Sequence, residues 1–230
     1  MIDSAEPYPG LASPQAAANG VSSGPPLRDF VQIGPQQTSF PGDPEEARAQ
    51  FQQFHAIGIR SLLEPSFLNA VVRVCDSVAF GPGSRDAPGF REVELSPQRA
   101  GRLLNLAVNR PAFLRWLEEI TGCEPLREFG GRLTQTLNRP GDELLWHDDF
   151  LEKEGRRLAL VLNLSTQPFD GGEFALRRKG HATIFEHKYT ELGSALIFEV
   201  NQTLEHRVQP LTSGGPRRVF AGWAFRAGEQ

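Results

Sequence analysis

The hydrophobic pattern of this 230-residue chain changes after Gly122, and the change restricts the folds open to it. From there to the C-terminus the chain consists of short apolar or alternating runs separated by Gly, Pro, Asp and Asn turns. The runs recur roughly every 10 to 15 residues with no helical pattern between them, which predicts an antiparallel sandwich or jelly roll and not βαβ units. They read LREFGGRLTQTLNRP, DELLWHDDF, RRLALVLNLS, GGEFALRRK, SALIFEV, TLEHRVQPL and RRVFAGWAF.

Helical patterns occupy much of the chain before this point, and the first lies in GDPEEARAQFQQFHAIG. Asp43 suits the N-cap, Pro44 the first helical position and Glu46 the third position of a capping box. Gly58 can end the helix, and the adjoining apolar stretch IGIRSLL is typical of a strand. His55, near the helix end, has no evident partner and is expected at the surface.

Three more helices are predicted before the sheet region. The segment SPQRAGRLLNLAVN has Ser96 as its cap and Pro97 at the first helical position, and PAFLRWLEEITG ends at Gly122. The segment EPSFLNAVVRVCDSVAF carries apolar residues at helical spacing, namely Phe67, Val71, Val74, Cys75 and Val78.

These patterns predict one domain of class α+β with three regions. Residues 1–27 are rich in Pro, Gly, Ala and Ser and cannot offset their own ordering entropy, which predicts a flexible tail. Residues 28–125 are expected to form a helical support region packed on the core. Residues 126–230 are expected to form the β-sheet core that carries the catalytic residues.

Composition and charge narrow the classes of function. The net charge of −4 and the isoelectric point near 5.8 give no bulk attraction to nucleic acid or to a membrane surface. Cys75 and Cys123 form no CxxC pair, so we expect free thiols and no zinc ribbon. The N-terminus has no signal-peptide pattern, and no apolar run approaches the roughly 18 residues of a membrane helix, which predicts a cytoplasmic protein without nucleic-acid or membrane partners.

A histidine and an aspartate interrupt the apolar run ELLWHDDF. Residues i and i+2 of a strand share a face, so His147 and Asp149 are expected to converge, with Trp146 and Asp148 on the other face. A neutral imidazole and a carboxylate aimed at one point are two potential metal ligands that need a third.

The third candidate ligand is His206, which lies in the alternating run QTLEHRVQPL. Another run, RRVFAGWAF, begins soon after it with Arg217 and Arg218. Every second residue from Arg217 to Trp223 is expected on the same strand face, and the residues between these two on that face are small or apolar. An arginine on such a face needs a buried anion, such as a ligand carboxylate that its guanidinium can bind in bidentate fashion.

Taken in order, WHDD, GGEF and EHRVQPLTSGGPRRVFAGWAF resemble the prolyl-4-hydroxylase-like branch of the Fe(II)/2-oxoglutarate-dependent dioxygenases. The resemblance covers about residues 126–226 and implies a double-stranded β-helix, a cupin-like jelly roll, buttressed by the N-terminal helices. It implies that His147, Asp149 and His206 are the Fe(II) ligands, a 2-His-1-carboxylate triad that also serves as the catalytic centre. Of Arg217 and its alternative Arg218, the resemblance favours Arg217 as the residue that anchors the distal carboxylate of 2-oxoglutarate, because the family's basic residue stands six residues before the tryptophan, as Arg217 does before Trp223.

The implied activity is hydroxylation of an unactivated C–H bond, with dioxygen as oxidant and release of succinate and CO2. The implied substrate is a peptide, a protein side chain or a small amino-acid-like molecule. Because Asp149 stands where related halogenases carry a small residue, the resemblance favours hydroxylation or desaturation over halogenation.

The chain departs from the family pattern at one position of the co-substrate site. Many relatives carry a tyrosine shortly before the HxD pair, whereas this chain has only Tyr8 and Tyr189. Thr134, Thr136 and Asn138 are the alternatives for a hydrogen-bond donor there, and we take Thr136 as the candidate. Trp223 is a candidate wall of the same pocket, with a core-filling role as the alternative.

Two other classes of function remain open at this point. One is a cupin-like metalloenzyme that uses no 2-oxo acid, which would have little use for Arg217. The other is a non-catalytic binding module on the same fold, against which the intact set of His147, Asp149 and His206 argues. Neither the oligomeric state nor the identity of the substrate follows from the sequence.

Overall fold

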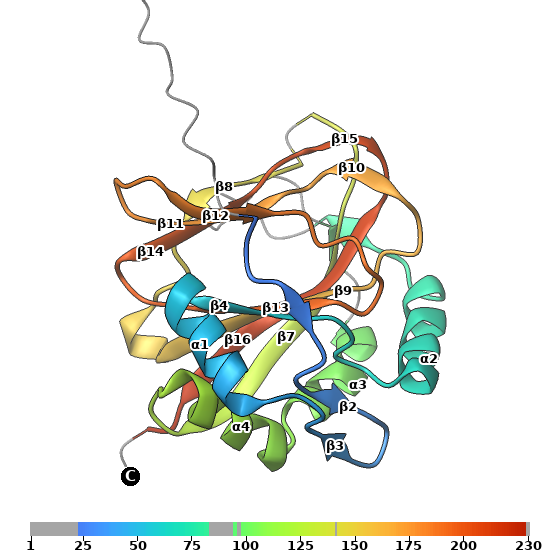
Figure 1. The fold of residues 1–230 in the computed structure, drawn as a ribbon. Coiled ribbons are helices and arrows are strands. Elements are labelled where there is room, and N and C mark those ends of the chain that lie inside the picture. The colour runs from blue at the N-terminus through green and yellow to red at the C-terminus, as the bar shows by residue number, and fades with distance from the viewer. Residues whose placement is uncertain (1–22, 83–93, 96–97, 141, 229–230) are drawn as a thin grey trace, which may run out of the picture.

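The computed structural model describes residues 23–82, 94–95, 98–140 and 142–228. Two β-sheets face each other, and helices cover the outer side of the larger sheet (Figure 1). The larger sheet has the strand order β1-β4-β13-β9-β16-β7-β6-β5 and the smaller sheet the order β12-β11-β14-β8. All of the pairings are antiparallel except that of β1 with β4. The predicted α+β class with an antiparallel jelly-roll core is confirmed.

The strands follow the alternating runs of the sequence. Those of the larger sheet are β1 (Leu27–Arg28), β4 (Ala56–Ile59), β5 (Gly81–Pro82), β6 (Glu94–Leu95), β7 (Leu126–Thr136), β9 (Arg156–Asn163), β13 (Ala195–Glu199) and β16 (Arg217–Arg226). Those of the smaller sheet are β8 (Leu144–His147), β11 (Phe174–Arg178), β12 (Thr183–His187) and β14 (Leu204–Val208). Two short pairs are β2 (Gln32–Ile33) with β3 (Thr38–Ser39), and β10 (Phe169–Gly171) with β15 (Leu211–Gly214).

Among the described residues, four α-helices precede β7, close to where the periodicity places them: α1 (Pro44–Phe54), α2 (Pro65–Asp76), α3 (Gln98–Val108) and α4 (Pro111–Thr121). A short 3-10 helix, η1 (Glu152–Glu154), precedes β9. Gly122 ends α4 in the left-handed conformation with φ of 70°, as predicted. The predicted cap of α3, Ser96 with Pro97, lies outside the described residues. No helix in the described part of the chain is long and apolar enough to cross a bilayer.

Helix α1 begins as predicted but ends before Gly58. The Asp43 side chain accepts a hydrogen bond of 2.9 Å from the backbone N–H of Glu45, whereas the Glu46 carboxylate pairs with Arg28. The C-cap is His55, which adopts a φ of 54°. Gly58 lies inside β4, where an added Cβ would come within 2.9 Å of the Pro25 carbonyl oxygen. The glycine therefore permits close backbone approach in the sheet and does not end the helix.

The expectation that His55 is a surface residue without a partner is wrong. Its Nδ1 lies 2.7 Å from Glu199 Oε2, and its Nε2 lies 2.8 Å from an Arg178 nitrogen. Both partners come from strands more than a hundred residues away in the sequence, so local sequence could not reveal them.

The N-terminal half of the chain supplies strands as well as helices to the larger sheet, because β1, β4, β5 and β6 all join it. Of the predicted tail, residues 1–22 lie outside the described residues. Ser23 is in contact with the smaller sheet, since its carbonyl oxygen lies 2.6 Å from His187 Nδ1. The three-region division of the chain stays a prediction.

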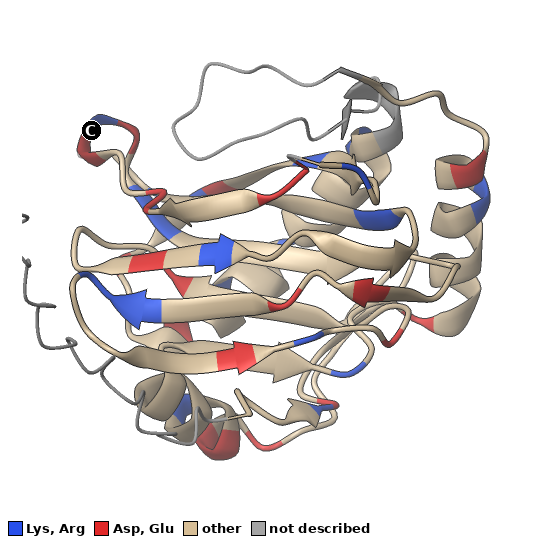
Figure 2. Cartoon of the chain, turned by 90° about the horizontal axis from the view of Figure 1, so that it is seen from above, with Lys and Arg blue, Asp and Glu red and all other residues tan. Residues whose placement is uncertain are grey.

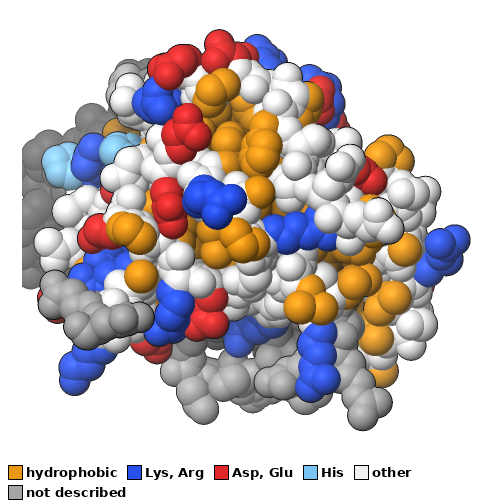
Figure 3. All heavy atoms as spheres, turned by 90° about the horizontal axis from the view of Figure 1, so that it is seen from below, with side chains coloured by type: hydrophobic (Ala, Val, Ile, Leu, Met, Phe, Trp, Pro, Cys, Tyr) orange, Lys and Arg blue, Asp and Glu red, His pale blue; other side chains and the backbone are white. Residues whose placement is uncertain are grey.

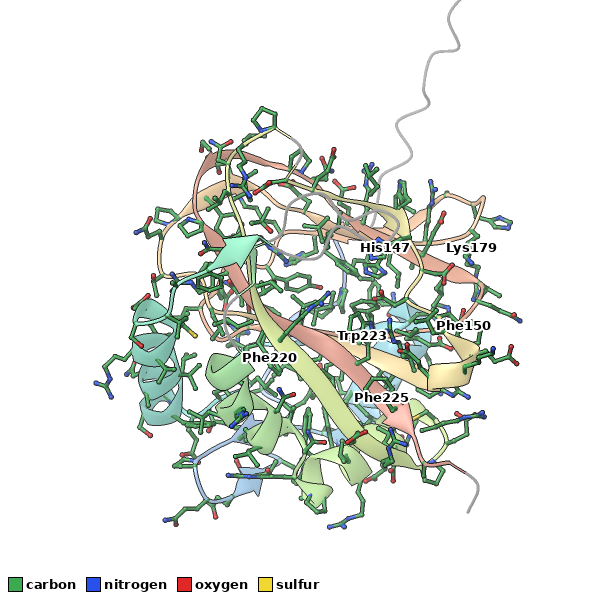
Figure 4. The ribbon with its side chains drawn as sticks, turned by 180° about the vertical axis from the view of Figure 1, so that it is seen from behind. His147, Phe150, Lys179, Phe220, Trp223 and Phe225 are labelled. Atoms are coloured by element: carbon green, nitrogen blue, oxygen red, sulfur yellow. The ribbon has the colours of Figure 1, made fainter. Side chains whose placement is uncertain are left out.

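Two hydrophobic clusters follow from the alternation of residues in the larger sheet. Phe220 and Ala224 of β16 belong to the cluster that faces the helices, whereas Trp223 packs against the cluster between the two sheets. Figure 4 shows Phe220 and Trp223 on opposite sides of the strand. Each fully buried large side chain contributes about 1.5–3 kcal/mol, so the double-sided burial of β16 is a principal source of stability.

The outer face of the smaller sheet is charged, as Figure 2 shows. Arg177 pairs with Glu205 at 2.6 Å, and its guanidinium lies 3.9 Å above the ring of Trp146. Lys179 pairs with Asp148 at 2.6 Å. On the helical side of the molecule, hydrophobic side chains lie in patches among charged ones (Figure 3). The smaller sheet thus turns its polar face to solvent and its apolar face to the larger sheet.

Candidate active site

The three predicted metal ligands come together on the inner side of the smaller sheet. His147 in β8 and His206 in β14 are directly paired in the antiparallel ladder, and their ring centroids lie 4.3 Å apart. Asp149 carboxylate oxygens lie 3.8 Å from His147 Nε2 and 3.6 Å from His206 Nε2. One ligand atom from each residue lies within 4.8 Å of the others, so the three could hold one metal ion.

The donor set identifies the kind of metal that would fit. Two imidazoles and one carboxylate grouped on one side of an ion leave several coordination positions open, which is the arrangement of non-haem Fe(II) oxygenases. His147 Nδ1 lies 2.6 Å from the Leu145 carbonyl oxygen. A proton on Nδ1 donates to that oxygen, which leaves the Nε2 lone pair available to a metal.

The prediction that Asp149 lies on a strand face is wrong. Strand β8 ends at His147, so Asp149 lies in the irregular segment after it and not on the strand face. Asp148 shapes that segment: its Oδ1 accepts a hydrogen bond of 3.1 Å from Phe150 N, and its Oδ2 pairs with Lys179 outside the barrel. This local turn, in place of strand alternation, directs Asp149 inward and Asp148 outward.

His206 is held in the neutral form that a metal ligand needs. Burial lowers the pKa of His206 to about 4, the Asp149 carboxylate opposes this shift, and the neighbouring His147 acts in the same direction as burial. At neutral pH the imidazole therefore carries no charge, and Nε2 keeps its lone pair.

Arg156, at the start of β9, supports the segment that carries Asp149, and sequence reasoning missed it. Its Nη1 donates to the Asp149 carbonyl oxygen at 3.3 Å and lies 4.0 Å from Asp149 Oδ1. Its guanidinium also lies 4.0 Å above the Trp223 ring. No spacing rule links these three residues, because they come from β9, β16 and the end of β8.

A cavity that is open to solvent lies between the two sheets, and His147, Asp149 and His206 are among the residues that line it. Figure 4 shows His147 and Trp223 in this inner region. Thr134 and Thr136 also line the cavity, whereas Asn138 is not among its lining residues. Of the alternatives for the missing tyrosine, the two threonines therefore remain.

Arg217 lies on the inner face of β16, paired directly with Thr136 of β7. Its side chain is buried, and no carboxylate of the described residues pairs with it. Burial lowers the pKa of Arg217 to about 10, so it is still charged at neutral pH. Arg218 faces the other way and pairs with Asp76 at 2.6 Å. A buried cation of this kind is costly unless an anionic ligand accompanies it.

Two buried polar atoms near Arg217 and the metal ligands have no hydrogen-bond partner within the described structure: the Tyr189 hydroxyl and Trp223 Nε1. Tyr189 lies between β12 and β13 and lines a smaller cavity together with Arg217 and Asn163. Sequence reasoning missed Tyr189 because the family pattern places a tyrosine just before His147. A buried cation and two unpaired donors fit a carboxylate-bearing ligand.

Comparison with known proteins agrees with this geometry. The sequence model of the 2OG-Fe(II) oxygenase superfamily matches residues 132–225. That segment belongs to the 2OG-Fe(II) oxygenase superfamily. It contains the two histidines, the aspartate and the arginine of the site, in the order that the resemblance required. A search of curated protein sequences finds no match.

Solved structures of the superfamily share the fold. An oxidoreductase of the 2OG-Fe(II) oxygenase family from Burkholderia pseudomallei aligns with a TM-score of 0.64 and 14% identity, covering 81% of this chain and 92% of its own. A Pseudomonas putida prolyl-4-hydroxylase aligns with a TM-score of 0.59 and 19% identity, over 81% of this chain and 100% of its own. A prolyl hydroxylase from Trichoplax adhaerens, in complex with a hypoxia inducible factor peptide fragment, aligns with a TM-score of 0.61 and 16% identity. The alignment covers 79% of this chain and 88% of that hydroxylase.

The match over residues 132–225 and the geometry of the site together indicate an oxidoreductase of the 2OG-Fe(II) dioxygenase type, with Fe(II) as cofactor and 2-oxoglutarate and dioxygen as co-substrates. The match of this segment to the superfamily favours this interpretation over both the cupin-like enzyme without a 2-oxo acid and the non-catalytic module. The likeness to prolyl hydroxylases extends to the fold and leaves the substrate open.

Proposed function

We propose that this 2OG-Fe(II) oxygenase hydroxylates an unactivated C–H bond of a peptide, a protein side chain or an amino-acid-like small molecule. His147, Asp149 and His206 hold Fe(II), and Arg217 binds the distal carboxylate of 2-oxoglutarate. The observation that carries the proposal is a three-residue ligand set within 4.8 Å that shares one cavity with a buried arginine.

Iron, when bound with 2-oxoglutarate and dioxygen, supplies the oxidising power for hydroxylation, with release of succinate and CO2. The chain's own residues bind the iron and keep its ligands in position. His206 stays neutral through burial, and His147 is oriented by the Leu145 carbonyl oxygen. Arg156 holds the backbone at Asp149.

The co-substrate is oriented by groups at one end of the cavity. Arg217 binds the distal carboxylate, and Thr136, directly opposite in the neighbouring strand, is the candidate for an additional hydrogen bond. Trp223 forms the wall near the metal ligands, and Val161, Phe174 and Phe198 exclude water from the space between.

The substrate class rests on analogy and on Asp149. The Trichoplax adhaerens prolyl hydroxylase binds a peptide, which supports a peptide or protein substrate for a chain of the same fold. The carboxylate of Asp149 occupies the place where a halogenase would need room for a halide ion, so hydroxylation is favoured over halogenation.

The deciding experiment is anaerobic. Fe(II) and then 2-oxoglutarate are added to the metal-free protein while the visible spectrum is recorded. We expect a weak charge-transfer band that requires both additions. His206→Ala should abolish the band, and Asp148→Asn should retain it, because Asp148 faces Lys179 outside the cavity and an asparagine at this position can still accept the hydrogen bond from Phe150 N.

Other outcomes would contradict the proposal in distinct ways. A protein that binds iron but gives no band with 2-oxoglutarate would point to a cupin-like enzyme or another 2-oxo acid. A protein that binds no iron, or a His206→Ala variant with an unchanged band, would contradict the assigned ligand set.

A further inference from the structure

We propose that the Tyr189 hydroxyl donates a hydrogen bond to the distal carboxylate of 2-oxoglutarate beside Arg217, and thereby makes the site selective for dicarboxylic 2-oxo acids. The inference rests on the proposed function, which places that carboxylate at Arg217. It adds a residue from a different part of the chain than the one in which the family resemblance expects a tyrosine.

The first observation is an unused donor. The Tyr189 hydroxyl is buried and has no hydrogen-bond partner within the described structure. Burial raises the pKa of Tyr189, so the hydroxyl keeps its proton and acts as a donor throughout the physiological range. A buried hydroxyl without a partner costs free energy of folding, and a ligand oxygen would remove that cost.

The second observation is the position of the hydroxyl-bearing side chain. Tyr189 and Arg217 line the same small cavity, which adjoins the metal-containing cavity through shared lining residues such as Phe174 and Val219. Asn163, another polar residue of that cavity, is already occupied: its Nδ2 donates to the Glu191 carbonyl oxygen, and its Oδ1 accepts from Ser165 N. Besides Arg217, Tyr189 is therefore the polar residue among those that line this cavity that is still available to a ligand.

The third observation is that neighbouring side chains hold the Tyr189 ring in place. The Tyr189 ring lies 4.2 Å from that of His187, whose Nδ1 is 2.6 Å from the Ser23 carbonyl oxygen. On the other side of the cavity, Gly172 adopts a φ of +74°, and an added Cβ would lie 3.2 Å from Arg217 Cδ. The glycine thus leaves room for the arginine side chain, and the tyrosine is fixed by the strand before it.

Selectivity follows from the two donors together. A carboxylate has enough lone pairs to accept from the guanidinium of Arg217 and from the Tyr189 hydroxyl at once, and the two donors approach from β16 and from the segment after β12. A 2-oxo acid with a methyl group in place of the distal carboxylate leaves both donors unpaired in a buried site. Sites built to hydrogen-bond a ligand group reject analogues that lack it.

Tyr189→Phe removes one oxygen atom and tests the proposal. Anaerobic titration of the Fe(II)-loaded protein measures the Kd of 2-oxoglutarate and of 2-oxopentanoate, which has a methyl group in place of the distal carboxylate. We expect the variant to bind 2-oxoglutarate about tenfold or more weakly, with the Kd of 2-oxopentanoate unchanged. The unfolding midpoint of the ligand-free variant should not fall, because the lost hydroxyl had no partner.

Thr190→Val is the matched control, since it removes an exposed hydroxyl from the adjacent position and should change neither Kd. Unchanged 2-oxoglutarate affinity in Tyr189→Phe, or equal weakening of both acids, would overturn this inference alone. A lowered unfolding midpoint of the ligand-free variant would do the same, by showing a structural hydrogen bond. Failure of the wild-type protein to bind 2-oxoglutarate would instead overturn the proposed function, and this inference with it.

Discussion

The imidazole rings of His147 and His206 lie 4.3 Å apart, on directly paired residues of β8 and β14. Because a shift of one residue in a strand moves every side chain to the opposite face, the register of this pair decides whether a metal site exists. The charged outer face supports the register, since the Trp146 ring lies under the guanidinium groups of Arg177 and Arg207. The close approach of these two candidate metal ligands is therefore a consequence of sheet pairing.

Replacing Arg217 should separate co-substrate binding from stability. In Arg217→Met we expect the Kd of 2-oxoglutarate to rise by about a hundredfold or more, because the distal carboxylate loses its buried counter-charge. The ligand-free variant should be at least as stable as the wild type, since a buried cation without a carboxylate partner is removed. Anaerobic titration and thermal unfolding measure the two effects.

Arg218→Met is the control for that experiment, because it removes contacts outside the cavity, namely the pair with Asp76, whose side chain is half exposed, and the approach of the guanidinium to the Phe80 ring. Such a pair is worth about 0–1 kcal/mol, and co-substrate affinity should not change. Equal loss of affinity in both variants would show that Arg217 does not act by direct contact.

Replacing Arg156 should weaken metal binding although Arg156 is not a ligand. In Arg156→Met we expect the Kd for Fe(II) to rise by up to about tenfold, because the Asp149 backbone loses a hydrogen bond and the Trp223 ring loses its stacked guanidinium. Equilibrium competition with a chelator measures the change. Arg157→Met, which removes a pair with Glu124 away from the cavity, should bind metal as the wild type does, and the hypothesis fails if the two variants behave alike.

Two glycine-to-alanine variants should have opposite effects on stability. An added Cβ at Gly222 would lie 2.2 Å from the Gly130 carbonyl oxygen and 2.3 Å from Gly131 Cα, both backbone atoms of β7. We expect Gly222→Ala to destabilise the fold by about 3 kcal/mol or more in urea unfolding.

Gly101, inside α3, is the counterpart, because its nearest contact for a Cβ is an ordinary 3.6 Å. Gly101→Ala should stabilise the fold by about 0.5–1 kcal/mol through its higher helix propensity. A tolerated alanine at Gly222 would show that β7 and β16 are farther apart than described.

The Cys75 thiol should report global unfolding. Burial raises its pKa to about 11, so at pH 8 the native thiol is almost wholly protonated and unreactive. Because burial raises the pKa of the Cys75 thiol, the native state favours the neutral thiol. This preference stabilises the fold below the pKa of the unfolded chain, and the stabilisation is lost as the pH rises through about 11. At pH 8, labelling of Cys75 with iodoacetamide should follow unfolding by urea.

Cys123 serves as the comparison in this measurement because it is only partly buried. Both thiols are free, as the sequence predicted. Fast labelling of Cys75 in the native protein would indicate local opening of α2 at the side of the larger sheet.

Several features could be predicted from the sequence because they depend on local chemistry. Alternation along β16 places Arg217 and Trp223 on one face, and Gly122 ends α4, since each needs only a period or a backbone conformation. The order of His147, Asp149 and His206 along the chain also indicated one metal site, because the residue types and their motifs are properties of the sequence itself.

Other features were decided only by tertiary structure, because they depend on contacts between distant residues. His55 finds Glu199, and Tyr189 reaches the cavity of Arg217, through pairing that brings separate strands together. Asp149 turns inward through a local turn after β8, which strand alternation did not predict. The sequence determined which side chains could bind iron and a dicarboxylic acid, whereas sheet register and packing decided which of them meet, because periodicity specifies a face and not the partner across it.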